Sequence, residues 1–214
     1  MKKNIELIMF DLDGTLVDSM KDITNAGNFT LENFGLMKKS EQEITSYVGD
    51  GREHLVKKLL GDKQNFLKEA VSVFGEYYKK HSMDNSILYP NVKEVLEYFK
   101  DKKKAVVSNK NHEEVVSNLK SLAIYDYFKN IIGGDEVEYI KPSPFQLCKT
   151  MQGFHVNEKK SIMVGDMDID ILAGKNAGIL TCAVTYGVSK KEDIIRAEPD
   201  FIIDDIIKLK DIIC

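Results

Sequence analysis

The sequence contains few cysteines and no long apolar run. Three cysteines occur among the 214 residues, at positions 148, 182 and 214, and none belongs to a Cys-x-x-Cys pair. An odd number of cysteines without that spacing argues against a disulfide framework and against a zinc site. No apolar stretch approaches the ~20 residues of a membrane-spanning helix, and Glu6 and Asp11 interrupt the apolar run near the start, which argues against a signal peptide. We therefore expect a cytoplasmic protein with reduced cysteines and no membrane partner.

Neither sign of charge dominates the sequence. The chain has 30 lysines and arginines against 34 aspartates and glutamates, which gives a formal net charge of -4 and no basic footprint for a nucleic-acid partner. Hydrophobic residues make up 43% and charged residues 30%, so a fibrous or largely disordered chain is excluded. The length fits one domain, or one domain with an insert, and does not distinguish a monomer from a homodimer.

Short apolar runs alternate with helical patterns along most of the chain. Between the runs, apolar residues recur at the three- and four-residue spacing of helices. Strands and helices in alternation predict a doubly wound parallel sheet covered on both faces, an α/β fold. The expected strands lie at residues 5–10, 104–107, 161–164, 181–185 and 201–203.

One long stretch breaks this alternation. From about residue 19 to residue 86 the apolar spacing is helical throughout, and no run resembles a strand. We expect a small all-helical cap domain at 18–86, inserted into a core domain formed by 1–17 and 87–214. Such an insert would act as a lid on two hinges.

Four aspartates follow two of the expected strands, where each strand ends. Asp11 and Asp13 follow the first strand, and Asp166 and Asp170 follow the strand at 161–164. Right-handed crossovers bring the carboxyl ends of parallel strands to one edge of the sheet, so we expect these residues to share one small volume. Ionised carboxylates that lie so close together repel one another unless they gain protons or a cation. A hard divalent ion with oxygen ligands, Mg²⁺ above all, fits this set.

A hydroxyl and a lysine are expected at the same edge of the sheet. Ser108 ends the strand at 104–107, and Lys141 follows a further strand-like stretch. Together with a metal and a carboxylate, they can hold a phosphoryl group and neutralise its charge during transfer. A carboxylate can itself accept the phosphoryl group as an aspartyl-phosphate. Each motif alone is typical of a turn, and only their joint occurrence in this order indicates a shared site.

Other phosphate and metal motifs do not fit the spacing. Counted from Asp166, the sixth and twelfth positions of an EF-hand loop hold Ile171 and Ala177 in place of Gly and Glu. The sequence has no G-x-x-x-x-G-K-[ST] and no G-x-S-x-G, so neither a Walker-type nucleotide site nor a nucleophile elbow is indicated.

These motifs together resemble those of the haloacid dehalogenase superfamily. The string DLDGTLVDS at 11–19 resembles its first motif, and Ser108 resembles the second. Lys141 in Lys-Pro-Ser-Pro resembles the third, and Gly165-Asp166 with Asp170 resembles the fourth. The resemblance covers the whole chain, and the insert after the first motif resembles the helical cap of that family. It implies a Rossmann-like α/β core with a small helical cap.

The resemblance also implies roles for the matching aspartates. Asp11 would be the nucleophile that attacks phosphorus. Asp13 would protonate the leaving alcohol and then take a proton from the attacking water. Mg²⁺ would be held by the Asp11 carboxylate, the Asp13 backbone carbonyl and Asp166, with Asp170 in support.

The phosphoryl group would be held by the remaining matching positions. Ser108 would donate a hydrogen bond to a phosphoryl oxygen, and Lys141 would neutralise phosphate and nucleophile. Leu12, Thr15 and Asn109 complete the expected substrate contacts, through backbone N–H groups at Leu12 and Asn109.

The first and fourth motifs favour a phosphatase over other members of the superfamily. Relatives that cleave carbon–halogen or carbon–phosphorus bonds typically lack an acid at the position of Asp13. The β-phosphoglucomutase branch usually has Glu-Asp where this chain has Gly165-Asp166, so a phosphomutase is the weaker alternative. Met167 departs from the small polar residue of many relatives.

Substrate choice is expected to lie in the cap, because the core motifs recognise only phosphate. Gly49, Gly51 and Arg52 form a Gly-x-Gly turn followed by a cation, which resembles the cap loop of bacterial phosphoglycolate phosphatases. Arg52 could bind a substrate carboxylate, although an ordinary turn with a solvated arginine explains the pattern nearly as well. The favoured substrate is the small molecule 2-phosphoglycolate, and pyrophosphate, a sugar phosphate or a nucleotide remain alternatives.

Two functions outside the phosphatases also use these residue types. A phospho-receiver domain combines acids, a hydroxyl and a lysine around Mg²⁺, but it has no helical insert after its first strand. A catalytically idle binding protein could share the fold, because a fold does not fix function. The presence of every catalytic residue type argues against that reading.

Overall fold

The computed structural model describes residues 2–214, and the chain forms two compact units. One unit comprises the chain up to Val17 together with Leu88–Cys214, and the other comprises Asp18–Ile87. Within residues 2–214, no helix combines the length and the apolar character needed to cross a membrane.

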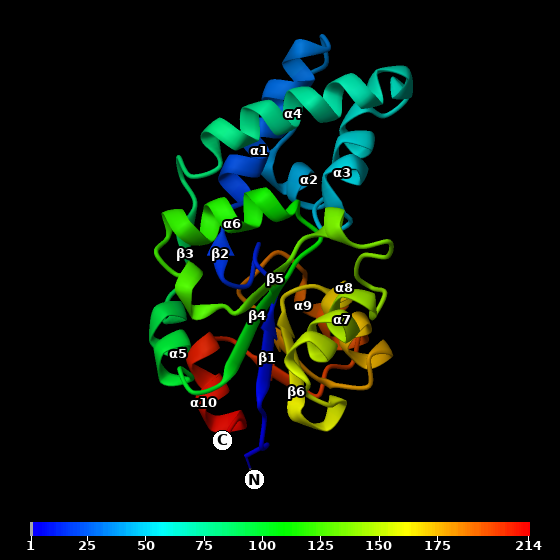
Figure 1. The fold of residues 1–214 in the computed structure, drawn as a ribbon. Helices are drawn as coiled ribbons and strands as arrows, with labels where there is room; N and C mark the ends of the chain where they lie inside the picture. Colours follow the sequence, from blue (N-terminus) through cyan, green and yellow to red (C-terminus); the bar gives the residue numbers. More distant parts are fainter. Residues whose placement is uncertain (1) are drawn as a thin grey trace. The chain divides into compact units, whose positions relative to one another are not determined.

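The first unit is built on a six-stranded parallel sheet (Figure 1). β1 lies in the middle, between β4 and β6, and the strand order reverses there. Such a reversal opens a crevice beyond the carboxyl ends of the two central strands, where α/β proteins bind ligands. In spatial order the strands are β5 (Asn130–Ile132), β4 (Lys103–Val107), β1 (Leu7–Phe10), β6 (Ser161–Gly165), β7 (Leu180–Val184) and β8 (Phe201–Ile203).

Alternate residues of each central strand face opposite sides of the sheet, and both sides are covered. Ile8 and Phe10 of β1 pack with helices α5 (Val92–Tyr98), α6 (His112–Ser121) and α10 (Leu209–Ile212). Leu7 and Met9 pack on the other side, against helices α7 (Phe145–Phe154) and α8 (Asp168–Asn176). The predicted doubly wound α/β core is therefore confirmed.

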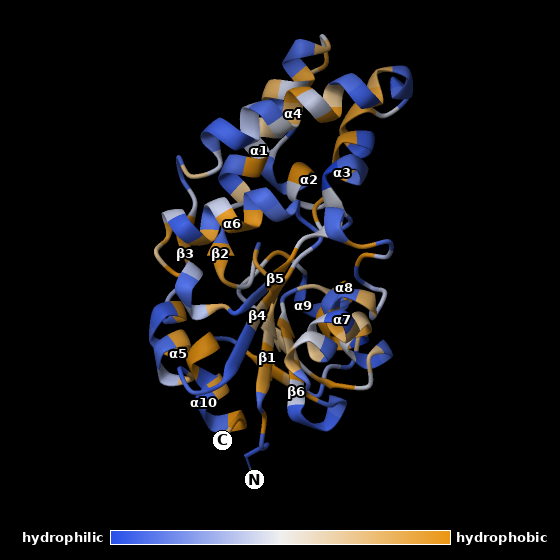
Figure 2. Cartoon of the chain, viewed as in Figure 1, coloured by the Kyte–Doolittle hydropathy of each residue, from blue (hydrophilic) through white to orange (hydrophobic). Residues whose placement is uncertain are grey.

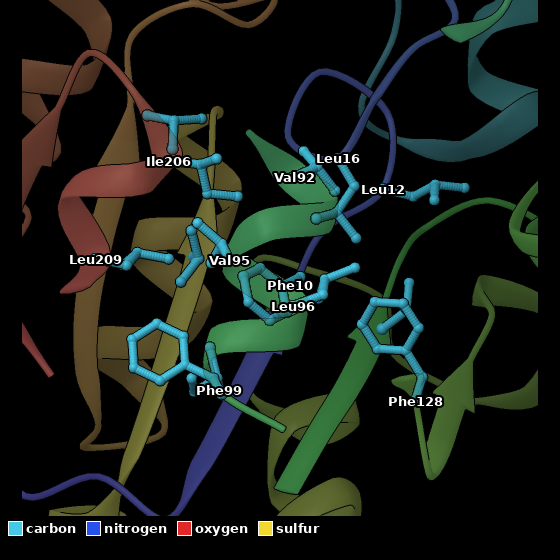
Figure 3. Packing of buried hydrophobic residues seen from close by; sticks show 14 of the residues in the cluster. Phe10, Leu12, Leu16, Val92, Val95, Leu96, Phe99, Phe128, Ile206 and Leu209 are labelled. Carbon is cyan, nitrogen blue, oxygen red and sulfur yellow. The ribbon is translucent and has the colours of Figure 1, made fainter. Parts of the chain in front are cut away.

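The packing on the first side is centred on Phe10. Figure 3 shows Val95 and Leu96 of α5, with Phe99 just after that helix, around the Phe10 ring, and Leu209 of α10 beside them. These side chains are all at most 3% exposed. β1 is coloured orange along its length in Figure 2, whereas α5 and α6 alternate blue and orange stretches, as expected for a buried strand beneath amphipathic helices.

Shorter elements complete the first unit. Ile194 of helix α9 (Lys191–Arg196) packs against Ala183 of β7. Single turns of 3₁₀ helix connect the larger elements at Tyr125–Tyr127, Gly134–Glu136, Glu158–Lys160 and Ile206–Lys208.

The second unit is helical, as the apolar spacing predicts. Its helices are α1 (Met20–Asn33), α2 (Glu41–Thr45), α3 (Gly51–Leu60) and α4 (Leu67–His81), with a 3₁₀ turn at Gln64–Phe66. Its buried apolar residues include Val56, Leu59, Phe74 and Tyr78. This core comes from the three- and four-residue spacing of apolar side chains along each helix.

The chain passes between the units at two short paired strands, β2 (Val17–Asp18) and β3 (Ile87–Leu88). Inside the second unit, Asp22 of α1 fixes the segment that leads into β3. Its buried carboxylate accepts bonds from the backbone N–H groups of Asn85 and Ser86, and from both of their side chains, at 2.7–3.1 Å. Both ends of this helical insert are therefore tied together.

Candidate active site

Three carboxylates meet beyond the carboxyl ends of β1 and β6. The backbone N–H of Asp11 bonds to the carbonyl of Val164 at 2.9 Å, which continues the pairing of the two strands by one residue. Asp11, Asp166 and Asp170 each offer a carboxylate oxygen within 4.8 Å of the other two, and all three residues are buried. The strand register therefore brings together acids that are 155 and 159 positions away from Asp11 in the sequence.

Lys141 lies among these acids. Its ammonium donates to Asp11 Oδ1 at 2.9 Å, to Asp170 Oδ1 at 2.6 Å and to the carbonyl of Val107 at 2.9 Å. Complete burial would by itself lower the pKa of Lys141, but the charges of Asp11 and Asp170 outweigh burial and raise it above its ordinary value. The lysine is thus held as a cation.

Asp166 is the carboxylate with the least favourable surroundings. Burial, followed by the charges of Asp170 and Asp11, raises the pKa of Asp166 well above its usual range. Two hydrogen bonds oppose this: Thr15 Oγ1 donates to Oδ1 at 2.9 Å, and the Val188 N–H donates to Oδ2 at 2.7 Å. These bonds fix the carboxylate but supply no positive charge.

Asp170 is held at both of its oxygens. Oδ1 accepts from Lys141, and Oδ2 accepts from the Met167 N–H at 3.0 Å, at the start of α8. Burial raises its pKa to about 6, although the nearby ammonium of Lys141 opposes that effect. Three buried carboxylates beside one ammonium leave an excess of negative charge, and oxygen donors so close together fit a hard divalent cation.

Asp13 is not one of the acids whose carboxylate oxygens lie within 4.8 Å of one another. Both of its carboxylate oxygens accept from the ammonium of Lys110, at 2.8 and 2.9 Å, and both side chains are about nine-tenths buried. The prediction that four aspartates share one small volume therefore holds for Asp11, Asp166 and Asp170. The Asp13 side chain instead contacts a second lysine, Lys110.

The segment after β4 is tied to Lys141 by two amide side chains, and the sequence did not predict these contacts. Asn109 accepts from the Lys141 N–H and donates to the Lys141 carbonyl, both at 2.9 Å. Gln146, fully buried at the start of α7, donates to the Ser108 carbonyl at 2.9 Å and accepts from the Lys141 N–H at 3.2 Å. Asn109 thus positions the lysine through its side chain, in addition to the backbone role expected of it.

The prediction that Lys141 directly follows a strand is wrong. β5 ends at Ile132, and Lys141 lies in the connection between the turn at Gly134–Glu136 and α7. The bonds from Asn109 and Gln146 take the place of strand pairing in positioning it, and the Lys141–Pro142 peptide bond is cis.

Leu12 and Thr15 lie in the turn that follows β1. The Leu12 carbonyl accepts from the N–H groups of Leu16 and Val17 at 2.9 Å, which closes the turn. Thr15 is fully buried, and its hydroxyl donates a hydrogen bond to Asp166. The structure thus connects Thr15 directly to the acid cluster.

The loop after β7 completes the surroundings of Asp166 and was not predicted. In addition to the Val188 bond, the Tyr186 hydroxyl donates to the Thr15 carbonyl at 2.8 Å. Gly187 lies so close that a Cβ there would collide with the Asp166 carboxylate and with the Gly14 carbonyl. No motif marks this loop, because the contacts of Val188 and Gly187 with Asp166 come from backbone atoms.

The candidate cap residues Gly49, Gly51 and Arg52 lie in the helical unit, before and at the start of α3. Gly49 and Gly51 have φ values of 128° and 82°, which favour glycine. The Arg52 guanidinium lies against Gly75 of α4: a Cβ at that position would be 2.6 Å from its Nη1. The glycine at 75 therefore makes room for Arg52.

A parallel sheet with buried carboxylates and a lysine beyond its central strands is the arrangement expected of the hydrolase family that the sequence motifs resemble. A model of the family described as haloacid dehalogenase-like hydrolase matches residues 8–184. The chain belongs to this family.

Similar proteins of known name and structure extend over the whole chain. The phosphoglycolate phosphatase of Aquifex aeolicus is 40% identical over 212 residues, which cover 97% of each chain, and that of Vibrio cholerae is 36% identical, over 99% of this chain and 98% of the other. The crystal structure described as a predicted phosphoglycolate phosphatase from Haemophilus somnus has a TM-score of 0.91 and 32% identity over 97% of each chain. A haloacid dehalogenase-like hydrolase from Streptococcus pneumoniae has a TM-score of 0.88 and 26% identity, again over 97% of each chain.

Proposed function

We propose that this protein is a Mg²⁺-dependent phosphatase that hydrolyses a small phosphomonoester, 2-phosphoglycolate, through an aspartyl-phosphate. The observation that carries the proposal is the Asp11 carboxylate, placed at the carboxyl end of the central strand β1 and bound by the ammonium of Lys141. The relatives named phosphoglycolate phosphatase match the full length of the chain, which supports the substrate.

In the proposed reaction, a carboxylate oxygen of Asp11 attacks phosphorus. The bond from phosphorus to the ester oxygen breaks, and Asp13 gives a proton to the departing alcohol. Water then attacks the aspartyl-phosphate, Asp13 takes a proton from it, and phosphate leaves with Asp11 restored. Ser108 donates to a phosphoryl oxygen, and Lys141 stabilises the negative charge that is spread over the phosphoryl group.

The acid cluster supports the metal assignment. Asp11 and Asp166 would hold the ion together with the Asp13 backbone carbonyl, and Asp170 would support them. When bound, the cation neutralises phosphoryl charge as a Lewis acid. The residues fit this role because their buried carboxylates exceed the ammonium charge available beside them.

We further propose that the two compact units act as a catalytic core and a cap, with the cap contributing to substrate choice. Arg52 is the candidate for this contribution. Because Gly75 makes room for its guanidinium, Gly75→Ala would displace Arg52 without removing its charge.

Phosphate release from a panel of phosphates tests the proposal. The panel contains 2-phosphoglycolate, pyrophosphate, glucose 1-phosphate, nucleoside monophosphates and an aryl phosphate, each with and without Mg²⁺. We expect Mg²⁺-dependent release with a clear preference for 2-phosphoglycolate, and none from Asp11→Asn. Preference for another compound would overturn the substrate and retain the chemistry, whereas normal turnover by Asp11→Asn would overturn the chemistry.

A further inference from the structure

A second lysine lies at the site, and the reaction above leaves it unused. The ammonium of Lys110 contacts both carboxylate oxygens of Asp13, at 2.8 and 2.9 Å. The Lys110 side chain is only 9% exposed. A nearly buried ammonium beside the proposed proton donor is therefore placed within the catalytic unit itself.

The backbone around Lys110 is tightly held. Its carbonyl accepts from the Gly134 N–H at 2.8 Å, and its N–H donates to Ser108 Oγ at 3.3 Å. A Cβ at Gly134 would come within 2.5 Å of the Asn109 carbonyl, so the glycine allows the loop after β5 to approach. Lys110 is thus fixed beside the hydroxyl proposed to bind phosphate.

Lys141 cannot provide a hydrogen bond to any further anionic group. An ammonium has three N–H donors. Those of Lys141 already bond to Asp11, to Asp170 and to the Val107 carbonyl. A second negative group on a substrate therefore needs another cation.

Lys110 lies within reach of such a group. In the proposed reaction the Asp13 carboxyl contacts the leaving ester oxygen, at about 2.6–3.2 Å. In 2-phosphoglycolate the carbon bonded to that oxygen carries the carboxylate. An ammonium that touches Asp13 therefore lies close enough to bind this carboxylate as well, as a charge-assisted partner.

We propose that Lys110 binds the carboxylate of the substrate, and that the core itself selects phosphomonoesters with a carboxylate on the carbon next to the ester oxygen. This inference rests on the proposed function. It differs from the expectation that the core recognises phosphate alone and that only the cap distinguishes substrates.

The test compares two substrates that differ only in that group: 2-phosphoglycolate and 2-hydroxyethyl phosphate, in which a hydroxymethyl group replaces the carboxylate. The quantity measured is kcat/KM for 2-phosphoglycolate divided by kcat/KM for 2-hydroxyethyl phosphate. We expect Lys110→Met to lower this ratio by ~10- to 100-fold, the usual loss for a hydrogen bond to a charged group. Lys110→Gln serves as a second uncharged variant, and Lys110→Arg should retain part of the preference.

The matched control is Lys100→Met, which removes a lysine whose side chain is 67% exposed, and it should leave the ratio unchanged. Inhibition by the two products provides an independent readout. Lys110→Met should weaken inhibition by glycolate much more than inhibition by inorganic phosphate, because only glycolate carries the carboxylate.

Two results would overturn the role of Lys110 and leave the phosphatase in place. One is an equal loss on both substrates, which would mean that Lys110 acts only by positioning Asp13. The other is a ratio that falls in Arg52→Met but not in the Lys110 variants, which would place carboxylate binding in the cap. If the wild-type protein releases phosphate from neither ester, the proposed function fails and the Lys110 inference fails with it.

Discussion

At the scale of single residues, Lys141 is the group on which the acid cluster depends. Its ammonium lies between Asp11 and Asp170, and all three side chains are at least nine-tenths buried. Removing one partner of a buried ion pair leaves an uncompensated charge, which costs far more than the pair contributes.

Lys141→Met should therefore destabilise the metal-free protein by about 3–5 kcal/mol. Chemical denaturation in a chelating buffer measures this change, and saturating Mg²⁺ should recover part of it. The exposed substitution Lys100→Met should change stability by less than about 0.5 kcal/mol. A metal-free Lys141→Met protein as stable as the wild type would show that this ion pair does not hold the cluster together.

Single residues could be predicted from the sequence where their type is specific to the chemistry. Asp11, Asp166 and Lys141 belong to recognisable motifs, and the structure brings them together. Asn109 was expected to act through its backbone, and nothing indicated Gln146. Their side chains bond to backbone groups brought close only by the folded chain, and no spacing in the sequence encodes such contacts.

At the scale of elements, the loop after β7 packs against the acid cluster and fixes the position of Asp166. Val188 donates to Asp166, and Gly187 leaves no room for a side chain between Asp166 and Gly14. The position of the carboxylate thus depends on a segment outside the four motifs.

Gly187→Ala should displace the Asp166 carboxylate and weaken Mg²⁺ binding by ~10- to 100-fold, as changes next to metal ligands do. Titration calorimetry of the metal-free protein measures the affinity, and circular dichroism confirms folding. Gly153→Ala is the matched control, because a Cβ there meets no atom within 4 Å. Equal Mg²⁺ affinities for the two variants would show that the loop after β7 does not position the Asp166 carboxylate.

Elements were predicted well where their apolar pattern is long or strongly buried. The runs at 104–107, 161–164 and 201–203 match β4, β6 and β8 within a residue, and the run at 5–10 contains β1. β5 was not located, because this edge strand has only three residues, with one buried, and gives little pattern. The helical character of the insert followed from apolar spacing, since each helix buries one face.

At the scale of the whole molecule, the acid cluster couples stability to pH and metal. Burial, together with neighbouring carboxylates, raises the pKa of Asp166, and burial raises that of Asp170 to about 6. An acid with a higher pKa in the folded state gains protons on folding. The metal-free protein therefore loses stability as pH rises from about 4, the value for an unfolded aspartate, through about 6.

A bound cation should reverse this loss, because it needs the ionised carboxylates. The increase in Tm caused by Mg²⁺ should be small at about pH 5 and much larger at about pH 7.5. Thermal unfolding with Mg²⁺ or with a chelator measures it at each pH. An increase of the same size at both pH values would show that the cluster does not bind the ion through these carboxylates.

The central claim is that Asp11 accepts the phosphoryl group, and the Asp13→Asn protein tests it most directly. An aryl phosphate has a leaving group that needs no proton, so the first step should proceed while hydrolysis of the aspartyl-phosphate, which needs Asp13 as base, stalls. The measurement is the mass of the peptide that contains Asp11 after mixing with aryl phosphate and Mg²⁺ and quenching in acid. The account predicts one added phosphoryl group on Asp11, together with a burst of one aryl alcohol per protein. A burst with the phosphoryl group on any other residue would contradict it.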